Sequence, residues 1–239
     1  MNEAFSGSSN DVLSALGDYD VSPTRGFVPE LDPPDALPEA FAPWDLMARA
    51  LPVLIRDQVT RRALSSLPVL NPLTLIEKSQ QERALLILTV FANAWVWGEA
   101  QLNLRLPACL SMPLCSLASL MQRPPITHYG CISLNNWRRL DATKAVSADN
   151  ACIQVRFLGG IDENWFFVAS LGVELEGVPL ILAIESATHA SRSGSDQALA
   201  DKLVQFNQAM PAVLHALERV REWCDPAMFY KRVRPYLAG

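Results

Sequence analysis

The chain has 239 residues, of which 50% are apolar and 19% charged, and its formal net charge at pH 7 is −5. This composition supplies a hydrophobic core for one large or two small globular domains, and it excludes a disordered chain. The acidic balance argues against a general nucleic-acid-binding protein, because no basic surface is available to displace counterions from phosphates.

In chain order, the first 43 residues contain six prolines and a Ser/Gly-rich start, which predict an extended arm. Residues 44–66 predict a helical region that is interrupted near Pro52. Ser79-Gln80-Gln81-Glu82 has the form of a capping box, so a helix is expected to begin at Ser79. The helix that follows is apolar on every side and requires other helices around it. A shorter helix is expected near residues 115–122.

Further along, residues 151–158 are the best strand candidate. Asp162 predicts the cap of a helix that runs through Glu185. Residues 196–223 predict another helix, because six apolar residues recur there at three- and four-residue steps: Leu199, Leu203, Phe206, Met210, Leu214 and Leu217. Asp225 followed by Pro226 predicts the start of a last helix. We therefore predict an all-α protein with at least six helices and at most a short β-hairpin.

Targeting and redox signals favour a cytoplasmic protein without a membrane segment. The start, MNEAFSGSSN, lacks a basic stretch followed by an apolar one, so we expect no signal peptide. The longest apolar run, residues 84–98, is shorter than the roughly 20 residues that span a bilayer. Five cysteines are scattered without a CxxC pair, which predicts reduced thiols and neither a disulfide framework nor a zinc site.

Four stretches carry features that composition does not explain: FANAWVWGE at 91–99, PPITHYGCISLNNWRRLD at 124–141, DENWFFVASLGVE at 162–174 and CDPAMFYKRVRPYLAG at 224–239. Together and in this order, with RGFVPELDP at 25–33, they resemble the indoleamine 2,3-dioxygenase family of haem enzymes. The resemblance implies that an extended arm (1–43) precedes a small helical domain (44–150). Residues 151–239 would then be the first part of a larger helical haem domain whose remainder is absent from this chain.

The resemblance also implies an activity. The family inserts both atoms of O2 across the indole C2–C3 bond of tryptophan or another indoleamine, giving N-formylkynurenine in the kynurenine pathway of tryptophan catabolism. The cofactor is haem b, whose iron binds O2 on the distal side and a histidine on the proximal side. Neither nucleic acid nor a membrane is expected as a partner.

Carried over residue by residue, the resemblance assigns nine site residues. It gives catalytic roles to Ser170 and Arg234, with Arg234 binding the substrate carboxylate. The implied substrate contacts are Tyr129, Phe166, Phe229 and Arg234. The implied haem contacts are Tyr129, Ile132, Phe166, Phe167, Ser170, Tyr230 and Leu237.

Helical spacing is compatible with these roles. Phe166 and Ser170 are four residues apart and share a helix face. At 100° per residue, Tyr230, Arg234 and Leu237 fall within about 60° of one another. A guanidinium fork suits a planar carboxylate, and aromatic rings suit an indole while excluding water. Aromatic pairs at this spacing are also typical of ordinary core packing.

None of the three histidines, His128, His189 and His215, matches the family's proximal ligand. The sequence therefore looks like the distal half of an active site, as expected of a fragment, a split protein or a natural truncation. An apolar surface would then need a cover, either a C-terminal fragment or a dimer partner. Two other functions stay open: a non-catalytic helical binding protein, and a haem- or oxygen-binding relative without dioxygenase activity.

Overall fold

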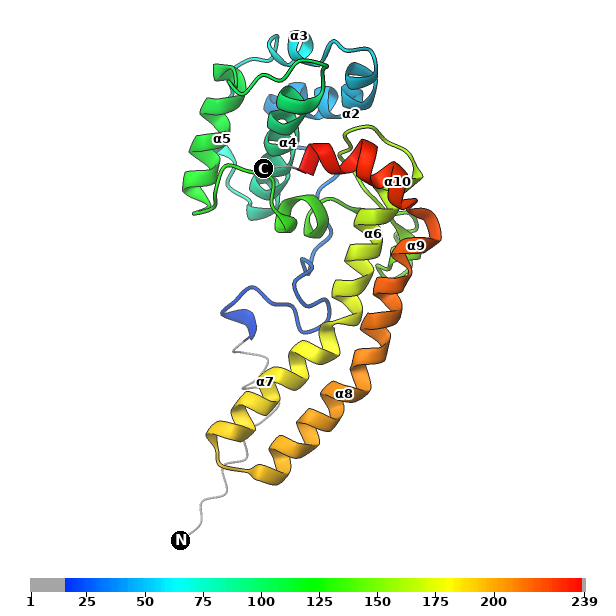
Figure 1. The fold of residues 1–239 in the computed structure, drawn as a ribbon. Helices are drawn as coiled ribbons and strands as arrows, with labels where there is room; N and C mark the ends of the chain where they lie inside the picture. The colour runs from blue at the N-terminus through cyan, green and yellow to red at the C-terminus, as the bar shows by residue number, and fades with distance from the viewer. Residues whose placement is uncertain (1–15, 238–239) are drawn as a thin grey trace. The chain divides into compact units, whose positions relative to one another are not determined.

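The computed structural model of the chain describes residues 16–237. These residues are predominantly helical, as Figure 1 shows, and the all-α prediction is confirmed. They include one short two-stranded sheet. They divide into two compact units. The first comprises Met1–Leu31 and Ala169–Val220, of which residues 1–15 lie outside the described part. The second comprises Asp32–Val168 and Arg221–Gly239. The predicted domain boundaries at residues 43 and 150 stay a prediction.

The second unit is a helical layer around one buried helix. Its α-helices are α2 (Ala42–Arg56), α3 (Thr60–Leu64), α4 (Lys78–Trp97), α5 (Ala108–Leu120), the first half of α6 (Ile161–Glu176), most of α9 (Val220–Trp223) and α10 (Pro226–Met228). Its single sheet pairs β1 (Arg138–Arg139) with β2 (Ala151–Cys152) in antiparallel register. Only two residues of the predicted strand 151–158 are therefore extended in the sheet. The break predicted at Pro52 is also misplaced, because α2 continues through Pro52.

Helix α4 is the centre of the second unit, and residues 82–92 are all buried. This confirms that a helix with apolar residues on every side must be covered all round.

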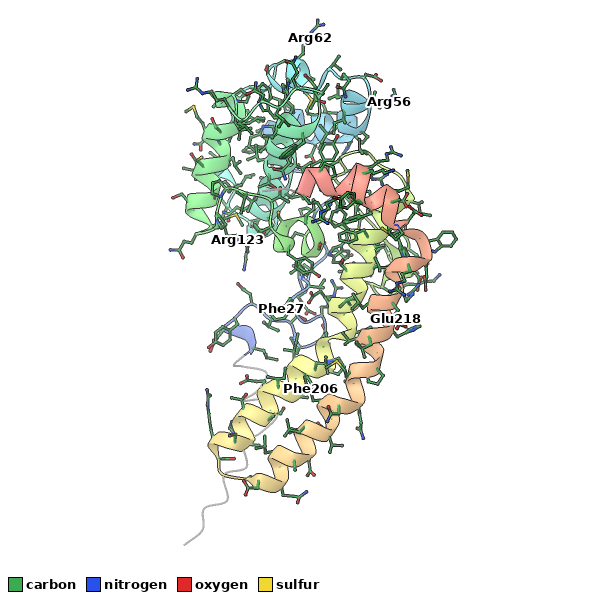
Figure 2. The ribbon with its side chains drawn as sticks, viewed as in Figure 1. Phe27, Arg56, Arg62, Arg123, Phe206 and Glu218 are labelled. Carbon is green, nitrogen blue, oxygen red and sulfur yellow. The ribbon has the colours of Figure 1, made fainter. Side chains whose placement is uncertain are left out.

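The prediction that residues 79–82 form a capping box is wrong. The helix begins at Lys78, before Ser79, and Glu82 does not turn back toward the helix start. The Glu82 carboxylate instead accepts a hydrogen bond of 2.5 Å from Arg123, a residue labelled in Figure 2 that follows α5.

A buried ion pair joins α2 to α4. The Arg83 guanidinium donates to the Asp45 carboxylate at 2.6 and 3.0 Å, and both side chains are only 6% exposed. The other Asp45 oxygen accepts the backbone N–H of Leu37 at 2.7 Å, and Arg83 also donates to the carbonyl of Pro34 at 2.9 Å. The pair therefore fixes the preceding extended segment against both helices.

Replacing Asp45 with alanine is expected to lower the free energy of unfolding by about 3–5 kcal/mol, because it leaves a buried guanidinium unpaired. Urea unfolding followed by circular dichroism measures this change. Asp57→Ala is the matched control, since it breaks an ion pair with Arg56 whose side chains are 71% and 49% exposed. Equal midpoints for the two variants would contradict a stabilising role for the buried pair.

The first unit is a helical hairpin with part of the N-terminal arm. Helices α7 (Val178–Arg192) and α8 (Asp196–Glu218) run side by side (Figure 1). The arm crosses α7 at Gly26, where φ is +63° and an added Cβ would lie 3.1 Å from the Ile181 side chain. Glycine suits this position, because other residues rarely adopt that backbone conformation and a side chain would require Ile181 to shift.

The predicted helix from Asp162 to Glu185 is two helices. Helix α6 begins at Ile161, one residue before the predicted cap, and ends at Glu176. Gly177 separates it from α7, and Pro179 stands in the first turn of α7. Proline is accommodated there because the N–H that it lacks has no partner within the first turn of a helix.

One helical stretch in the described part of the chain is long and apolar enough to cross a membrane by length and composition alone. It covers Ile161–Arg192, and 28% of its most apolar window is buried. Core helices of soluble proteins meet the same two criteria, so this stretch is weak evidence for a membrane segment.

The cysteines of the second unit differ in accessibility. Cys115 is exposed on α5, whereas Cys131 is fully buried and its thiol donates to the His128 carbonyl at 3.0 Å. Burial raises the pKa of the Cys131 thiol, which disfavours the reactive thiolate.

We expect maleimide to modify Cys115 at least about a hundredfold faster than Cys131 in the native protein. Peptide mass spectrometry measures both rates. The Cys115→Ser variant should lose the fast phase, and equal rates in the wild type would contradict the expectation.

Candidate active site

The C-terminal segment of the second unit begins as predicted. The Asp225 carboxylate accepts the backbone N–H groups of Ala227 at 2.9 Å and Met228 at 2.8 Å, which confirms Asp225 as a helix cap. After the single turn of α10, the chain forms a π-helical turn over Phe229–Val233 and a 3₁₀ turn over Arg234–Leu237. Such π turns are rare and occur frequently at functional sites.

This segment lines a cavity of about 610 Å³. The described lining residues are Phe229, Tyr230, Arg234, Pro235 and Leu237. The spacing argument that grouped Tyr230, Arg234 and Leu237 at 100° per residue assumed a continuous α-helix. That assumption is wrong, because the number of residues per turn changes twice along the segment. The structure nevertheless brings these three side chains to one cavity. Pro235 is an additional lining residue.

Aromatic side chains of α6 pack against one of the lining residues, Phe229, although Phe166 and Phe167 are not themselves among the described lining residues. The Phe166 ring on α6 lies 4.2 Å from the Phe229 ring, and it meets the Phe167 ring edge-on at 5.3 Å. The Arg234 guanidinium carbon lies 5.2 Å from the centre of the Tyr230 ring, a distance that permits a cation–π interaction. Arg234 is the one charged residue among the described lining residues. The cavity therefore joins an apolar aromatic lining to a single guanidinium.

The remaining predicted site residues lie elsewhere in the structure. Tyr129 is 47% exposed and precedes a π-helical turn, whereas Ile132 and Phe167 are buried in the second unit at 6% and 2% exposure. None of the three is among the cavity's described lining residues. Ser170 lies on α6 but belongs to the first unit, so its place relative to the cavity stays a prediction.

The cavity suits part of a haem site. Its aromatic and aliphatic side chains fit one face of a flat macrocycle, but none of its described lining residues is a histidine. The His128 Nε2 atom is buried without a hydrogen-bond partner, and burial lowers the pKa of His128, which keeps its imidazole neutral. His189 and His215 are exposed on α7 and α8 of the first unit. The described lining residues thus offer an apolar surface and no histidine to ligate iron.

Fold and site together define an all-α protein with an aromatic cavity that carries one arginine. A model of the family described as indoleamine 2,3-dioxygenase matches residues 15–239. The chain belongs to this family.

Several relatives support the assignment. Indoleamine 2,3-dioxygenase 1 of Rattus norvegicus is 32% identical over 227 residues, which cover 94% of this chain and 55% of the rat protein. An indoleamine 2,3-dioxygenase of Aspergillus nanangensis is 29% identical over 92% of this chain and 55% of its own length. A 6-hydroxytryptophan 2,3-dioxygenase of Fusarium equiseti is 28% identical over 96% and 57%. The chain thus spans about half the length of the curated relatives it matches.

Proposed function

We propose that this chain supplies the substrate side of a haem dioxygenase that cleaves the indole C2–C3 bond of tryptophan with O2 to give N-formylkynurenine. One observation carries the proposal: Arg234 and the aromatic residues Phe229 and Tyr230 line the same cavity. Tryptophan has both matching groups, a planar carboxylate for a guanidinium fork and an indole for an aromatic lining.

In this proposal the chain's own residues bind and orient the substrate. Arg234 holds the carboxylate by two parallel hydrogen bonds, and this fixes the distance from the carboxylate to the indole. Phe166 and Phe229, in ring contact at 4.2 Å, form an apolar surface that excludes water from the indole. The relatives' names, which include a 6-hydroxytryptophan dioxygenase, support an indole amino acid as the substrate class.

Haem b is the proposed cofactor, and Phe166, Tyr230 and Leu237 are the predicted haem contacts at or beside the cavity. When bound, its iron supplies the O2 chemistry that no amino-acid side chain provides. We propose that the iron ligand comes from polypeptide other than these 239 residues. His128 does not take this role in the proposal, because its free nitrogen is buried away from solvent.

A complementation experiment tests the proposed function. The chain is mixed with hemin, a reductant and the part of the rat relative that it does not match, and N-formylkynurenine is followed by its absorbance. We expect tryptophan cleavage by the mixture and none by either piece alone. A haem-loaded mixture that binds tryptophan but does not cleave it would contradict the dioxygenase proposal.

A binding role without chemistry is the second candidate function. Between α7 and α8 the first unit has an apolar cavity of about 500 Å³, whose lining includes Ile184, Leu203 and, labelled in Figure 2, Phe206. Ile184 and Leu203 are 53% and 51% exposed, which favours a partner that covers this face. The proposed partner is a C-terminal fragment of the family or a second copy of the chain.

The proposed compartment is the cytoplasm, because the five cysteines are free.

A further inference from the structure

The first turn of α6 carries two consecutive acidic residues, Asp162 and Glu163. Their carboxylates accept hydrogen bonds from backbone N–H groups outside the helix. Glu163 is 1% exposed, and its carboxylate accepts the N–H groups of Phe157 at 2.6 Å, Leu158 at 2.9 Å and Gly159 at 2.7 Å. Burial raises the pKa of Glu163, while the three N–H donors oppose that rise. A buried carboxylate with three donors is costly to disturb, because each lost bond leaves a buried polar group unsatisfied. Glu163 therefore fixes the backbone of residues 157–159.

This backbone supports the far end of the C-terminal segment. Phe157 is 1% exposed, and its ring stacks on that of Tyr236 with centres 4.9 Å apart and an interplanar angle of 21°. The carbonyl of Tyr236 also accepts a hydrogen bond of 2.7 Å from the Asn93 side chain on α4. Tyr236 is thus held both by its ring and by its backbone.

The near end of the same segment is held by Asp162. Its carboxylate accepts the backbone N–H of Asp225 at 2.8 Å. Asp225 in turn caps α10, the turn immediately before Phe229. Arg234 therefore lies between two attachment points, residues 225 and 236. The first is bonded directly to Asp162, and the second packs on Phe157, whose backbone is held by Glu163.

We infer that Asp162 and Glu163 are positioning residues for Arg234, which set where its guanidinium meets the substrate carboxylate. This inference rests on the proposed function. The physical reason is that the segment between the two attachments is a π turn followed by a 3₁₀ turn, and neither geometry is stable over long runs. With such a backbone, external contacts at its ends decide its conformation. Specificity for a carboxylate substrate would then depend on residues that never touch it.

Hydrogen–deuterium exchange of the 239-residue chain tests the structural half of the inference. Asp162→Ala removes the acceptor for Asp225, and Glu163→Gln replaces an acceptor oxygen with an NH2 group that cannot accept. Each is expected to speed exchange in residues 225–237 about fivefold. Asp162→Asn keeps an acceptor oxygen and should restore wild-type exchange. Asp196→Ala removes an acidic residue from the first turn of α8 in the first unit and should leave residues 225–237 unchanged.

Steady-state kinetics of the complemented protein test the functional half. Asp162→Ala and Glu163→Gln are expected to raise the KM for tryptophan about tenfold, since a displaced fork loses a charge-assisted bond. The KM for tryptamine, which has no carboxylate, should stay unchanged, and so should kcat once tryptophan is saturating.

Unchanged exchange in residues 225–237 overturns the inference. Equal losses on both substrates also overturn it, because they indicate a general structural role. If the complemented protein is inactive, the proposed function fails, and the exchange data still decide whether α6 holds the segment.

Discussion

Replacing Arg234 with alanine is expected to lower kcat/KM for tryptophan about a hundredfold in the complemented protein. Charge-assisted hydrogen bonds contribute about 1.5–3 kcal/mol each, and removing the fork leaves a desolvated carboxylate unpaired, so the loss lies at the upper end of that range. At about 1.4 kcal/mol per factor of ten, this corresponds to two orders of magnitude. Arg234→Lys should not restore activity, because an ammonium cannot reproduce the bidentate geometry.

Tryptamine is the control substrate for this prediction, since it lacks the carboxylate. Its cleavage should be nearly the same in the wild type and in Arg234→Ala. Arg232→Ala is the matched control variant, because Arg232 is exposed on the same segment and is not among the described lining residues of the cavity. A loss of only several-fold on tryptophan, or an equal loss on tryptamine, would show that Arg234 is not the carboxylate anchor. Arg232 would then be the residue to test.

Hemin added to the isolated chain is expected to give no sharp Soret band of a histidine-ligated haem. The reason is that no described lining residue of the cavity is a histidine, and the one histidine of the second unit has its free nitrogen buried. Adding the unmatched part of the rat relative should produce a defined band and tighten hemin binding at least about a hundredfold, because a new iron–imidazole bond is then available. Absorbance titration measures both changes.

The matched control is the chain in which His128, His189 and His215 are all replaced by alanine. Its spectrum with hemin, alone and after complementation, should equal that of the wild type. A sharp histidine-ligated spectrum from the isolated wild-type chain that disappears in His128→Ala would contradict the prediction. It would also make His128 the iron ligand.

Much of this fold follows from signals between near neighbours in the sequence. The Asp225 cap was predictable because its partners lie only two and three residues away. The burial of α4 was predictable because a helix with apolar residues on every side has no face to offer to water. The family stretches identified Arg234, and the structure places it in an aromatic cavity. The lack of a histidine that matches the family's proximal ligand also pointed to a partial protein, which agrees with the half-length match to the curated relatives.

Only the tertiary structure decided which polar groups pair with distant partners. Glu82 had the spacing of a capping box, yet it bonds to Arg123, 41 residues away. Asp45 and Arg83, 38 residues apart, form the buried ion pair. Even a nearby pairing was not predicted: Glu163 looked like any acidic residue in a first helical turn, yet it accepts the N–H groups of residues 157–159, four to six residues before it. A local pattern states which bonds a residue is able to make within one turn. Which bond forms depends on the segment that packs against it and removes its water, because a buried polar group must find a partner there.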